Sequence, residues 1–520
     1  MLWLGEKRSD EILEKMASIQ EKLAESLKVL KDYQDTHDNL VINGMSVLGE
    51  VHTRRLIANG YLQSVIKGWY IPSFPGSEGD TTVWYASYWN FLVAYANKRF
   101  GKDWCLTPEE SLAFYAGETV APKQLIIRAP KGRNNLVSLM FGDTMMDISA
   151  SLPNQMEVDS LHGVHLYSLE EALVFCSPQY FKADALNART CLCGIKDASE
   201  ILKIVLEEGN TTRAGRIIGA LRSVGRADVA DEIVKCMARF GYVIRPENPF
   251  EDDSTLSFDR SLPAYATRIK LLWEKMRKQI LGLNLPKPDG TLQQQEILQN
   301  METNYVKDSY HSLSIEGYRV TEGLIEQVRS GKWDPKSSVQ DADRKNALAA
   351  RGYYQAFLSG KESVKKIFGG ENPGMVFAME HDSWHFELFQ PCVVAGIIKA
   401  TDLIGYRSHQ VYIRGSKHTP LSPNAVRDAM AMLCELMKEE EDAFVRAILG
   451  HFFFAYIHPY MDGNGRTARF IMNVMLVTGG YGWTIVPVEK RQEYMDALEQ
   501  ASIQQDITTF ARFISCLASR

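Results

Sequence analysis

The residue types best suited to chemistry gather in one segment near the end of the chain, residues 458–469 (HPYMDGNGRTAR). His458 can accept a proton at neutral pH, as a general base must. Asp462 offers hard carboxylate oxygens, which suit a Mg²⁺ ion that bridges phosphate groups. A base and a metal ligand this close together predict the transfer of a phosphate-linked group.

Glycines and arginines in the same segment indicate where phosphates would bind. Gly463 and Gly465 flank Asn464, and glycines let consecutive backbone N–H groups turn toward one anion. A helix predicted to begin near Arg466 adds the positive end of its dipole. Arg466 and Arg469 share a helix face and can bind further phosphate oxygens. A Gly-Asn-Gly turn alone would indicate only a capped helix junction, but the full set favours a phosphate-transfer site.

Helices must position this segment. Residues 444–457 are apolar with helical spacing and end at His458, and residues 467–476 begin the next helix. The same spacing predicts further helices at 267–280, 301–315, 345–357, 425–440 and 489–502. The second half of the chain is therefore expected to be mainly helical.

The segment resembles the Fic family motif, His-x-Phe-x-Asp/Glu-Gly-Asn-Gly-Arg-x-x-Arg, with Tyr460 in place of Phe. The resemblance extends over residues 301–519. Fic proteins mostly transfer AMP from Mg·ATP to a hydroxyl of a target protein. The resemblance implies that His458 deprotonates a Ser, Thr or Tyr of the target, and that Asp462 holds Mg²⁺ on the α- and β-phosphates.

The remaining nucleotide contacts are likewise implied by this resemblance. Backbone groups from Gly463 to Gly465, with Asn464, would cradle phosphates, while Arg466 and Arg469 would bind the β and γ groups. Gly465 distinguishes the chain from a kinase-like branch that has Lys there, so an AMP transferase is implied. Tyr494 would lie on the adenine side, although Ser502 stands where some relatives have an Asn that contacts adenine.

A second short match lies at residues 312–317 (SLSIEG), within a predicted helix near 305–318. It resembles the family's inhibitory motif, Ser/Thr-x-x-x-Glu-Gly/Asn. Ser312 and Glu316 share a helix face, and the resemblance implies that Glu316 pairs with Arg469 and blocks placement of the γ-phosphate. The alternative is an ordinary amphipathic helix with an exposed Glu. Beside a complete catalytic motif, self-inhibition is favoured.

A third region would dock the target. Residues 410–414 alternate at period two and predict a hairpin strand formed by Val411, Tyr412, Ile413 and Arg414. We call residues 405–420 the flap. Its edge could hold a target backbone by strand addition and bring the target hydroxyl to His458. The alternative is a plain surface hairpin.

The 520 residues suggest about three domains at ~150 residues each. The sequence favours five segments: an N-terminal helix (1–39), a winged-helix-like module (40–75), an α+β domain (76–195), a helical module (196–250) and a Fic domain (255–520). The fold class is thus a mainly α Fic core with a small β-hairpin flap, preceded by a winged helix and an α+β domain.

The first 75 residues contain two features that could bind a partner, either a second copy of the chain or DNA. Six apolar residues within 9–33 follow a near-heptad spacing, which suits either a coiled-coil homodimer or packing on the chain's own domain: Ile12, Met16, Ile19, Leu23, Leu27 and Leu30. Residues 40–73 read as two helices and a hairpin that turns at Lys67-Gly68, and they resemble the winged helix of abortive-infection-type antitoxins. DNA is therefore a candidate partner, although the net charge of −6 argues against a uniformly basic surface.

Several features point to a cytoplasmic chain with no membrane partner. The apolar stretches 445–457 and 470–488 are interrupted by charged or helix-breaking residues. The eight cysteines are sparse, which suits reduced thiols better than disulfides or structural zinc. His381 and His385 have metal-like spacing, but a packed or surface pair is favoured because no partner ligand is evident.

The sequence is consistent with three functions. The leading one is a self-inhibited protein AMP transferase that uses ATP and Mg²⁺. The second is a DNA-binding transcriptional or toxin–antitoxin-like regulator with the Fic domain as nucleotide sensor. The third is a de-AMPylating enzyme that uses Glu316.

Overall fold

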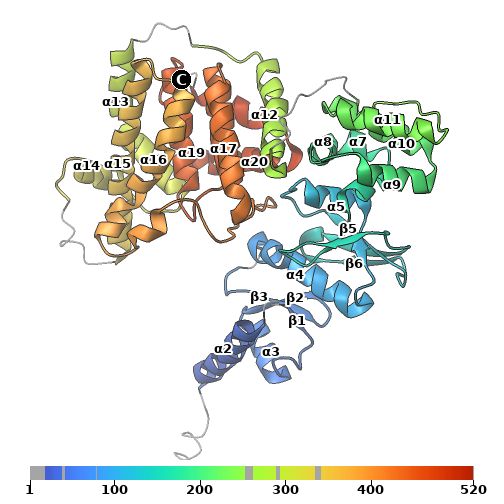
Figure 1. Ribbon diagram of the computed structural model, residues 1–520. Coiled ribbons are helices and arrows are strands. Elements are labelled where there is room, and N and C mark those ends of the chain that lie inside the picture. Colours follow the sequence, from blue (N-terminus) through green and yellow to red (C-terminus); the bar gives the residue numbers. More distant parts are fainter. Residues whose placement is uncertain are drawn as a thin grey trace, which may run out of the picture.

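The computed structural model describes residues 18–37, 41–77, 79–251, 262–288, 293–333 and 341–518. A large helical bundle forms the second half of the chain, and smaller modules of the first half lie beside and below it (Figure 1). The part of the predicted N-terminal helix that precedes residue 18 lies outside the described residues.

The first module combines two helices with a three-stranded antiparallel sheet. Its elements are α2 (Ile19–Thr36), β1 (Ile42–Asn43), α3 (Glu50–Ala58), β2 (Leu62–Ile66) and β3 (Trp69–Pro72), and the strand order is β1-β3-β2. The hairpin predicted around Lys67-Gly68 is confirmed, with Gly68 at a positive φ of 81°. A helix predicted at the start of this region is wrong, because the chain there forms β1 and a turn.

Helix α2 packs on its own module. Ser26 is fully buried, and the Arg55 guanidinium of α3 donates to Ser26 Oγ and to the Lys22 carbonyl. These contacts match the interpretation in which the helix packs within its own domain. The winged-helix likeness, DNA binding and a homodimer stay predictions.

An α+β domain follows. Its order is α4 (Thr81–Phe100), β4 (Cys105–Leu106), α5 (Pro108–Tyr115), β5 (Gln124–Ala129), β6 (Asn135–Ser138), η1 (Met140–Gly142), β7 (Thr144–Ser149), β8 (Met156–Val158) and β9 (His165–Tyr167). Four strands form one sheet in the order β4-β5-β7-β6, with β5 and β7 parallel. The aromatic stripe of α4 is core, as its helical spacing predicts, since Trp84, Tyr88 and Phe91 are buried.

A helical module completes the first half. It contains α6 (Leu169–Phe175), α7 (Tyr180–Ala183), α8 (Ala185–Cys193), α9 (Ser199–Glu208), α10 (Thr211–Ser223) and α11 (Ala227–Arg239). Two arginines bond to the backbone of this module. Arg216 donates to the carbonyls of Val174 and Cys176, and the buried Arg226 donates to the Ile195 carbonyl.

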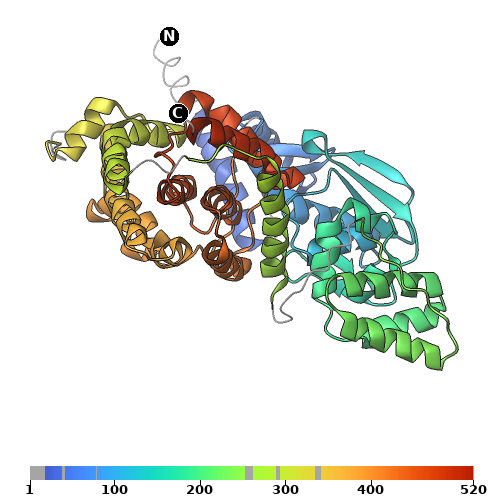
Figure 2. The ribbon, with the colours of Figure 1, turned by 90° about the horizontal axis from the view of Figure 1, so that it is seen from above.

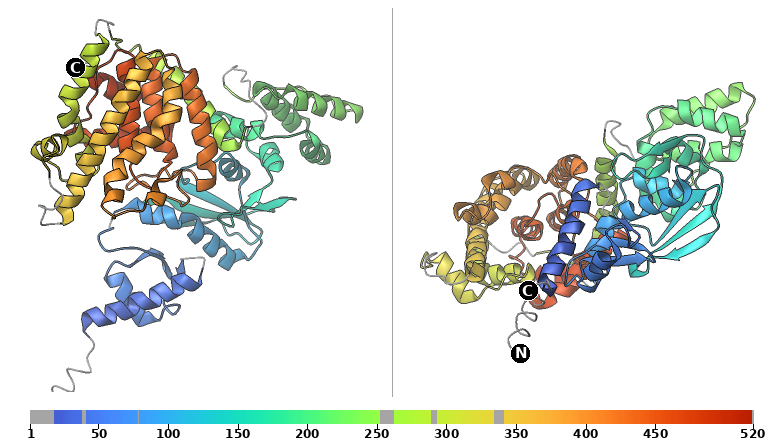
Figure 3. Two further views of the ribbon diagram at one scale, coloured as in Figure 1. Left: turned by 60° about the vertical axis from the view of Figure 1, so that its left-hand side comes forward. Right: turned by 90° about the horizontal axis from the view of Figure 1, so that it is seen from below.

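The second half is a helical bundle, as predicted. It comprises α12 (Ala264–Gly282), α13 (Gln294–Ile315), α14 (Glu322–Arg329), α15 (Asp341–Phe368), α16 (Pro373–Val394), η2 (Ala400–Leu403), α17 (Pro423–Glu439), α18 (Ala443–Ile457), α19 (Asn464–Thr478), η3 (Val488–Lys490), α20 (Arg491–Gln504) and α21 (Thr508–Ala518). Helices α18 and α19 are buried along nearly their whole length, and the other helices surround them (Figure 2). Helix α12 of the bundle packs against α8 of the helical module, and the flap bonds to the α+β domain, whereas the first module and α9–α11 extend away from the bundle (Figure 3).

The flap differs from its prediction. Residues 410–414 form no strand, and His418 pairs with Val120 of the α+β domain in an isolated bridge. The Gln410 side chain donates to the carbonyls of Val411 and Pro420, so it takes up acceptors that a hairpin ladder would use. Sequence alternation could not show that the flap pairs with another domain.

Three other expectations concern the whole chain. No helix among the described residues is long and apolar enough to cross a membrane. All eight cysteines are free thiols. Within the described ranges no three His, Cys, Asp or Glu side chains cluster as metal ligands would.

Candidate active site

The loop between α18 and α19 is a tightly closed turn. Helix α18 ends at His458, which adopts a left-handed φ of 54°. The Asn464 side chain donates to the Tyr460 carbonyl (2.8 Å) and accepts from the Tyr460 N–H (3.0 Å). Gly463 has a φ of 83°, and a Cβ there would lie 2.6 Å from the Phe389 ring. The sequence places glycine at this position because no side chain would fit.

Asn464 therefore differs from its expected role. Its side chain is buried and bonds the loop to itself, so it shapes the turn and is not open to phosphate. The first N–H groups of α19, from Asn464 to Arg466, have no carbonyl partner within the helix, and no side chain of the N-cap residue bonds to them. Such groups, with the helix dipole, form an anion-binding site.

His458 is arranged as a neutral base. Its Nδ1 lies 3.1 Å from the Ala455 carbonyl, so this nitrogen donates and Nε2 is left to accept a proton. Burial lowers the pKa of His458 to about 4. Arg407 holds the loop in place, since its Nε donates to the His458 carbonyl (2.7 Å) and its backbone N–H to the Pro459 carbonyl (2.9 Å).

Asp462 is a fitting partner for a magnesium ion. Its side chain is 70% exposed, and its Oδ1 accepts from the Gly463 N–H (2.6 Å) and lies 3.6 Å from an Arg466 nitrogen. Mg²⁺ is commonly held by one or two carboxylates, with waters and substrate phosphates completing its shell. One exposed carboxylate beside an anion-binding helix end meets that requirement.

Arg466 is buried at the edge of the site. Its guanidinium lies 5.2 Å from the centre of the Tyr318 ring and 4.9 Å from that of Phe389. Within the part of the chain that the structure describes, its Nε has no hydrogen-bond partner. The two rings fix the guanidinium by cation–π contact, and its polar atoms keep capacity for an anion.

The structure brings together the three residues of the predicted inhibitory contact. Arg469 Nε donates to Ser312 Oγ (2.9 Å), and one terminal nitrogen donates to the Ser312 carbonyl (3.0 Å) and to Glu316 Oε1 (2.8 Å). Glu316 caps the end of α13. A Cβ at Gly465 would lie 2.5 Å from Glu316 Oε1, so the carboxylate sits directly against the first turn of α19.

The charge state of Glu316 follows from its neighbours. Burial raises the pKa of Glu316, but the positive charges of Arg469 and Arg466 lower it by more. The pKa of this carboxyl is therefore below its ordinary value. Glu316 is thus an ionised carboxylate held where an anion would bind. The other terminal nitrogen of Arg469 is buried without a partner among the described residues, so this arginine retains a donor for a further anion.

Tyr494 does not lie where the resemblance implied. Its ring is buried in the bundle, and its hydroxyl lies 2.8 Å from His451 Nε2. Phe510 and Phe513 of α21 pack beside it. The residue therefore supports the core behind Arg469 and is not open to a nucleotide. Helical spacing located α20 but could not show which face turns inward.

The two histidines predicted to be a packed or surface pair are buried and support the catalytic loop. The His385 ring stacks on Tyr460 with centres 3.7 Å apart, and its Nε2 lies 2.9 Å from the Asp462 carbonyl. Burial lowers the pKa of His385 to about 4, so the neutral ring donates this bond. His381 contacts the Tyr406 hydroxyl at 3.2 Å. Their spacing was the only signal in the sequence, and it did not reveal this contact.

A further contact links the two halves of the chain, and no sequence signal indicated it. His418 Nε2 lies 2.9 Å from the Tyr456 carbonyl and its Nδ1 lies 2.9 Å from Thr119 Oγ1, which in turn lies 3.0 Å from the Tyr456 hydroxyl. Burial lowers the pKa of His418 to about 4, so the ring is neutral. We call Thr119, His418 and Tyr456 the interdomain joint. It fixes the last turn of α18, which presents His458.

Other flap residues also contact the first half. Arg414, an expected target contact, is 80% exposed and lies 3.3 Å from an Asp80 oxygen. Thr81 Oγ1 donates to the Ser416 carbonyl (3.1 Å). Val411, Tyr412 and Ile413 are half-buried. The α+β domain thus supports the flap along much of its length.

Comparison with known proteins agrees with this geometry. Residues 383–476, which include the catalytic loop and the flap, match the sequence model of the Fic/DOC family. The chain carries a Fic/DOC family domain. Helix α13, which carries Ser312 and ends at Glu316, lies outside the matched residues and packs against α19.

Curated relatives share this domain over part of their length. Protein adenylyltransferase fic-1 of Caenorhabditis briggsae is 27% identical over 232 residues, which cover 41% of this chain and 40% of that protein. Protein adenylyltransferase Fic of Nematostella vectensis is 34% identical over 119 residues, covering 22% of this chain and 27% of that protein. The chain thus spans about two-fifths or less of the length of these relatives.

Solved structures give weaker likenesses. Fic-1 (residues 134–508) of C. elegans is 19% identical with a TM-score of 0.36, covering 67% of this chain and 88% of that one. A Fic domain containing signaling protein from Bacteroides thetaiotaomicron is also 19% identical, with a TM-score of 0.33, and covers 49% of this chain and 92% of that one.

Proposed function

We propose that the protein is a self-inhibited protein adenylyltransferase, which moves AMP from Mg·ATP to a hydroxyl of a target protein and of itself. The neutral His458, with Nε2 free to accept a proton beside the anion-binding start of α19, carries this proposal. The names of the C. briggsae and N. vectensis relatives support the same reaction.

Each functional group of the site has one role in the proposed reaction. The target hydroxyl oxygen attacks the α-phosphorus of ATP, its proton passes to His458 Nε2, and pyrophosphate leaves. The N–H groups at the start of α19, with Arg466 and Arg469, hold the phosphates. Asp462 would hold Mg²⁺, which when bound supplies positive charge against the phosphate oxygens. His385 and Arg407 keep the loop in this shape.

Self-inhibition follows from where Glu316 lies. Its carboxylate occupies the space against Gly465 and bonds to Arg469, so a phosphate placed there would meet a like charge and lose an arginine contact. ATP would then bind with its phosphates poorly aligned. Removing the carboxylate would free both the space and the arginine.

The test is incorporation of labelled AMP into the full-length protein itself. Glu316→Gly is expected to label itself at least tenfold faster than the wild type, because charge-assisted hydrogen bonds of about 1.5–3 kcal/mol each are exchanged. Adding His458→Ala to that variant is expected to abolish labelling, since it removes the base while the loop remains closed by Asn464.

A matched control is Glu322→Gly, which removes an exposed Glu on the neighbouring α14 and should leave labelling at the wild-type level. Labelling by the His458→Ala double variant at the rate of its parent would show that the base is assigned incorrectly. No labelling by Glu316→Gly would contradict the proposed transfer itself.

A further inference from the structure

A buried carboxyl group lies behind Arg469, on the helix that carries the inhibitory contact. Asp308 belongs to α13, one turn before Ser312, and it is buried. The Tyr353 hydroxyl of α15 donates to Asp308 Oδ2 (2.7 Å). Burying a carboxyl group is costly unless its oxygens are hydrogen-bonded. Inhibition by Glu316 does not use Asp308, so this carboxyl has another purpose.

Two hydroxyl groups connect Asp308 to Arg469. The Tyr353 hydroxyl bonds to Asp308 on one side and to the Ser312 hydroxyl on the other. Arg469 Nε in turn donates to Ser312 Oγ (2.9 Å). We call Asp308, Tyr353 and Ser312 the buried relay, since all three side chains are buried. The relay joins α13 and α15 to the arginine of α19.

The carboxylate fixes the direction of these hydrogen bonds. An ionised carboxylate can only accept, so Tyr353 donates to it, and the Tyr353 oxygen is left to accept from Ser312. Ser312 then turns a lone pair toward Arg469 Nε. Burial raises the pKa of Asp308 to about 6, although the Tyr353 hydroxyl and the charge of Arg469 oppose that rise, so the carboxyl is mainly ionised at neutral pH.

The buried relay and Glu316 hold different atoms of Arg469. The relay takes Nε, whereas Glu316 Oε1 takes one terminal nitrogen, which also donates to the Ser312 carbonyl. The other terminal nitrogen is buried without a partner among the described residues. Removing Glu316 therefore leaves the guanidinium fixed by Ser312, with N–H groups available to a phosphate. An arginine that is already fixed loses little freedom when it binds.

We propose that Asp308 positions Arg469 for the γ-phosphate of ATP, through Tyr353 and Ser312. Asp308 is a positioning residue, because it acts on the arginine and does not touch the nucleotide. The inference rests on the proposed adenylyltransferase function. It adds that α13 serves the active form as well as the inhibited one, since Ser312 holds the arginine that Glu316 blocks.

The test compares binding of ATP and ADP in the presence of Mg²⁺. The parent is full-length Glu316→Gly, His458→Ala protein, which lacks the base and so binds nucleotide without transfer, and calorimetry gives both affinities. Asp308→Asn keeps the shape of the side chain, but an amide can also donate to Tyr353, so the direction of the bonds is lost. ATP binding is expected to weaken about three- to tenfold, the factor of one hydrogen bond. ADP binding should stay unchanged, because ADP has no γ-phosphate.

Two further variants break the relay at its other members. Tyr353→Phe and Ser312→Ala should each weaken ATP binding by a similar factor and leave ADP binding unchanged. Binding of ADP by the same sample also shows that the variant is folded.

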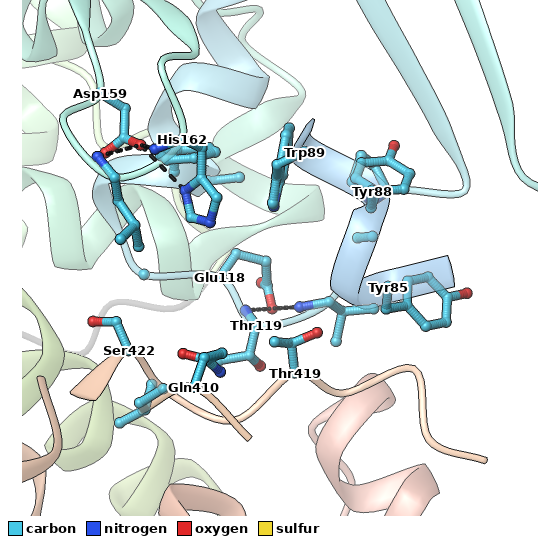
Figure 4. A pocket seen from close by; sticks show the side chains of 18 of the residues that line it. Tyr85, Tyr88, Trp89, Glu118, Thr119, Asp159, His162, Gln410, Thr419 and Ser422 are labelled. Carbon is cyan, nitrogen blue, oxygen red and sulfur yellow. Dashed lines mark hydrogen bonds and ion pairs between the residues drawn. The ribbon is translucent and has the colours of Figure 1, made fainter. Parts of the chain in front are cut away.

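Matched controls remove hydroxyl groups outside the buried relay. Tyr305→Phe is matched to Tyr353→Phe, because Tyr305 is also a buried tyrosine of the bundle. Ser422→Ala is matched to Ser312→Ala, because Ser422 lines a cavity of about 420 Å³ between the α+β domain and the flap (Figure 4). Both controls should keep the parent's ratio of ATP to ADP affinity.

A double variant separates positioning from general support of the fold. With Arg469→Ala already in the parent, Asp308→Asn should leave the ratio of ATP to ADP affinity unchanged, because Asp308 acts through that arginine. A loss that persists without Arg469 would overturn the inference. So would unchanged ATP binding, or an equal loss for ADP, in all three relay variants.

Self-labelling by the Glu316→Gly protein with His458 intact is measured alongside. Self-labelling together with unchanged affinities in the relay variants would refute only this inference. The absence of self-labelling would refute the proposed function.

Discussion

Two of the contacts that hold the active site differ in kind. The inhibitory contact joins Glu316 to Arg469 through opposite charges at the start of α19. The interdomain joint connects Thr119, His418 and Tyr456 through hydrogen bonds of neutral groups. A phosphate carries the same charge as Glu316 and can replace it on the arginine. The interdomain joint contains no charged group that a phosphate could replace, so nucleotide binding leaves it in place.

In the proposed mechanism the inhibitory contact acts as a switch, whereas the interdomain joint is a fixed support. Hydrogen bonds to charged groups contribute about 1.5–3 kcal/mol and neutral ones about 0.5–1.5 kcal/mol. The stronger contact is the one that a ligand can take over once Glu316 is removed, because a phosphate then forms an equally strong contact with Arg469. The weaker contact stays in place because leaving its buried polar groups unpaired would cost about 1–3 kcal/mol each.

The largest expected effect comes from removing the arginine of the inhibitory contact. Arg469→Ala should not activate the protein, because the phosphates lose this donor when Glu316 loses its partner. In the Glu316→Gly background, Arg469→Ala should lower AMP incorporation by about 10- to 100-fold, the equivalent of about one charge-assisted bond. Self-labelling of the four proteins at one Mg·ATP concentration measures this.

The double variant should behave like Arg469→Ala alone. If Arg469→Ala by itself labels as fast as Glu316→Gly, then the arginine serves inhibition only, and the two roles assigned to it would have to be separated.

A smaller effect is expected from breaking the joint. Thr119→Val in the Glu316→Gly background keeps the shape of the side chain but removes the hydroxyl between His418 and Tyr456. Because the last turn of α18 would lose support, kcat for self-labelling should fall about three- to tenfold. The KM for ATP should stay unchanged, since no phosphate contact is altered.

Thr81→Val is the matched control for the joint. It removes a neutral hydrogen bond from the same domain to the flap, at the Ser416 carbonyl, without touching α18. An equal fall in kcat for both variants would mean that the flap, and not the position of His458, limits the reaction.

The smallest expected effect concerns pH. The pKa of Glu316 is lowered, because the charges of Arg469 and Arg466 outweigh its burial. A lowered pKa in the folded state keeps the inhibitory contact intact at all pH values above the ordinary carboxyl value, and the contact weakens only as pH falls through the folded value. Burial holds the pKa of His458 at about 4, so the base also stays neutral.

The ratio of Glu316→Gly to wild-type self-labelling should therefore change less than about twofold between pH 8 and pH 5.5. Rates of both proteins in buffers of constant ionic strength measure it. A wild type that becomes active toward pH 6 would show that acid releases Glu316, and that the inhibitory contact is weaker than its geometry implies.

The sequence predicted local features better than long-range ones. Helical spacing located the bundle, and the order of residues 458–469 located the loop, because both depend on neighbours along the chain. The pairing of Glu316 with Arg469 was also predicted, but from the family resemblance. Asn464 and Tyr494 were assigned to the nucleotide from the same resemblance, and helical spacing could not show that both side chains pack inward.

The flap and the joint show where such prediction ends. Alternating residues at 410–414 would suit a strand, yet the segment forms none, because Gln410 takes the acceptors and the α+β domain supplies the pairing at His418. The contacts between Thr119 and His418 join segments from different domains, and no periodic pattern records them.

The interdomain joint also determines how late in synthesis the active site can be completed. Thr119 and His418 are separated by 299 residues, which at ~5–20 residues per second is about 15–60 s of translation. During that interval the α+β domain is complete while the segment it will bond has not yet left the ribosome. The base at His458 is made later still. Activity can therefore arise only after most of the chain exists, and a product truncated before the flap would lack it.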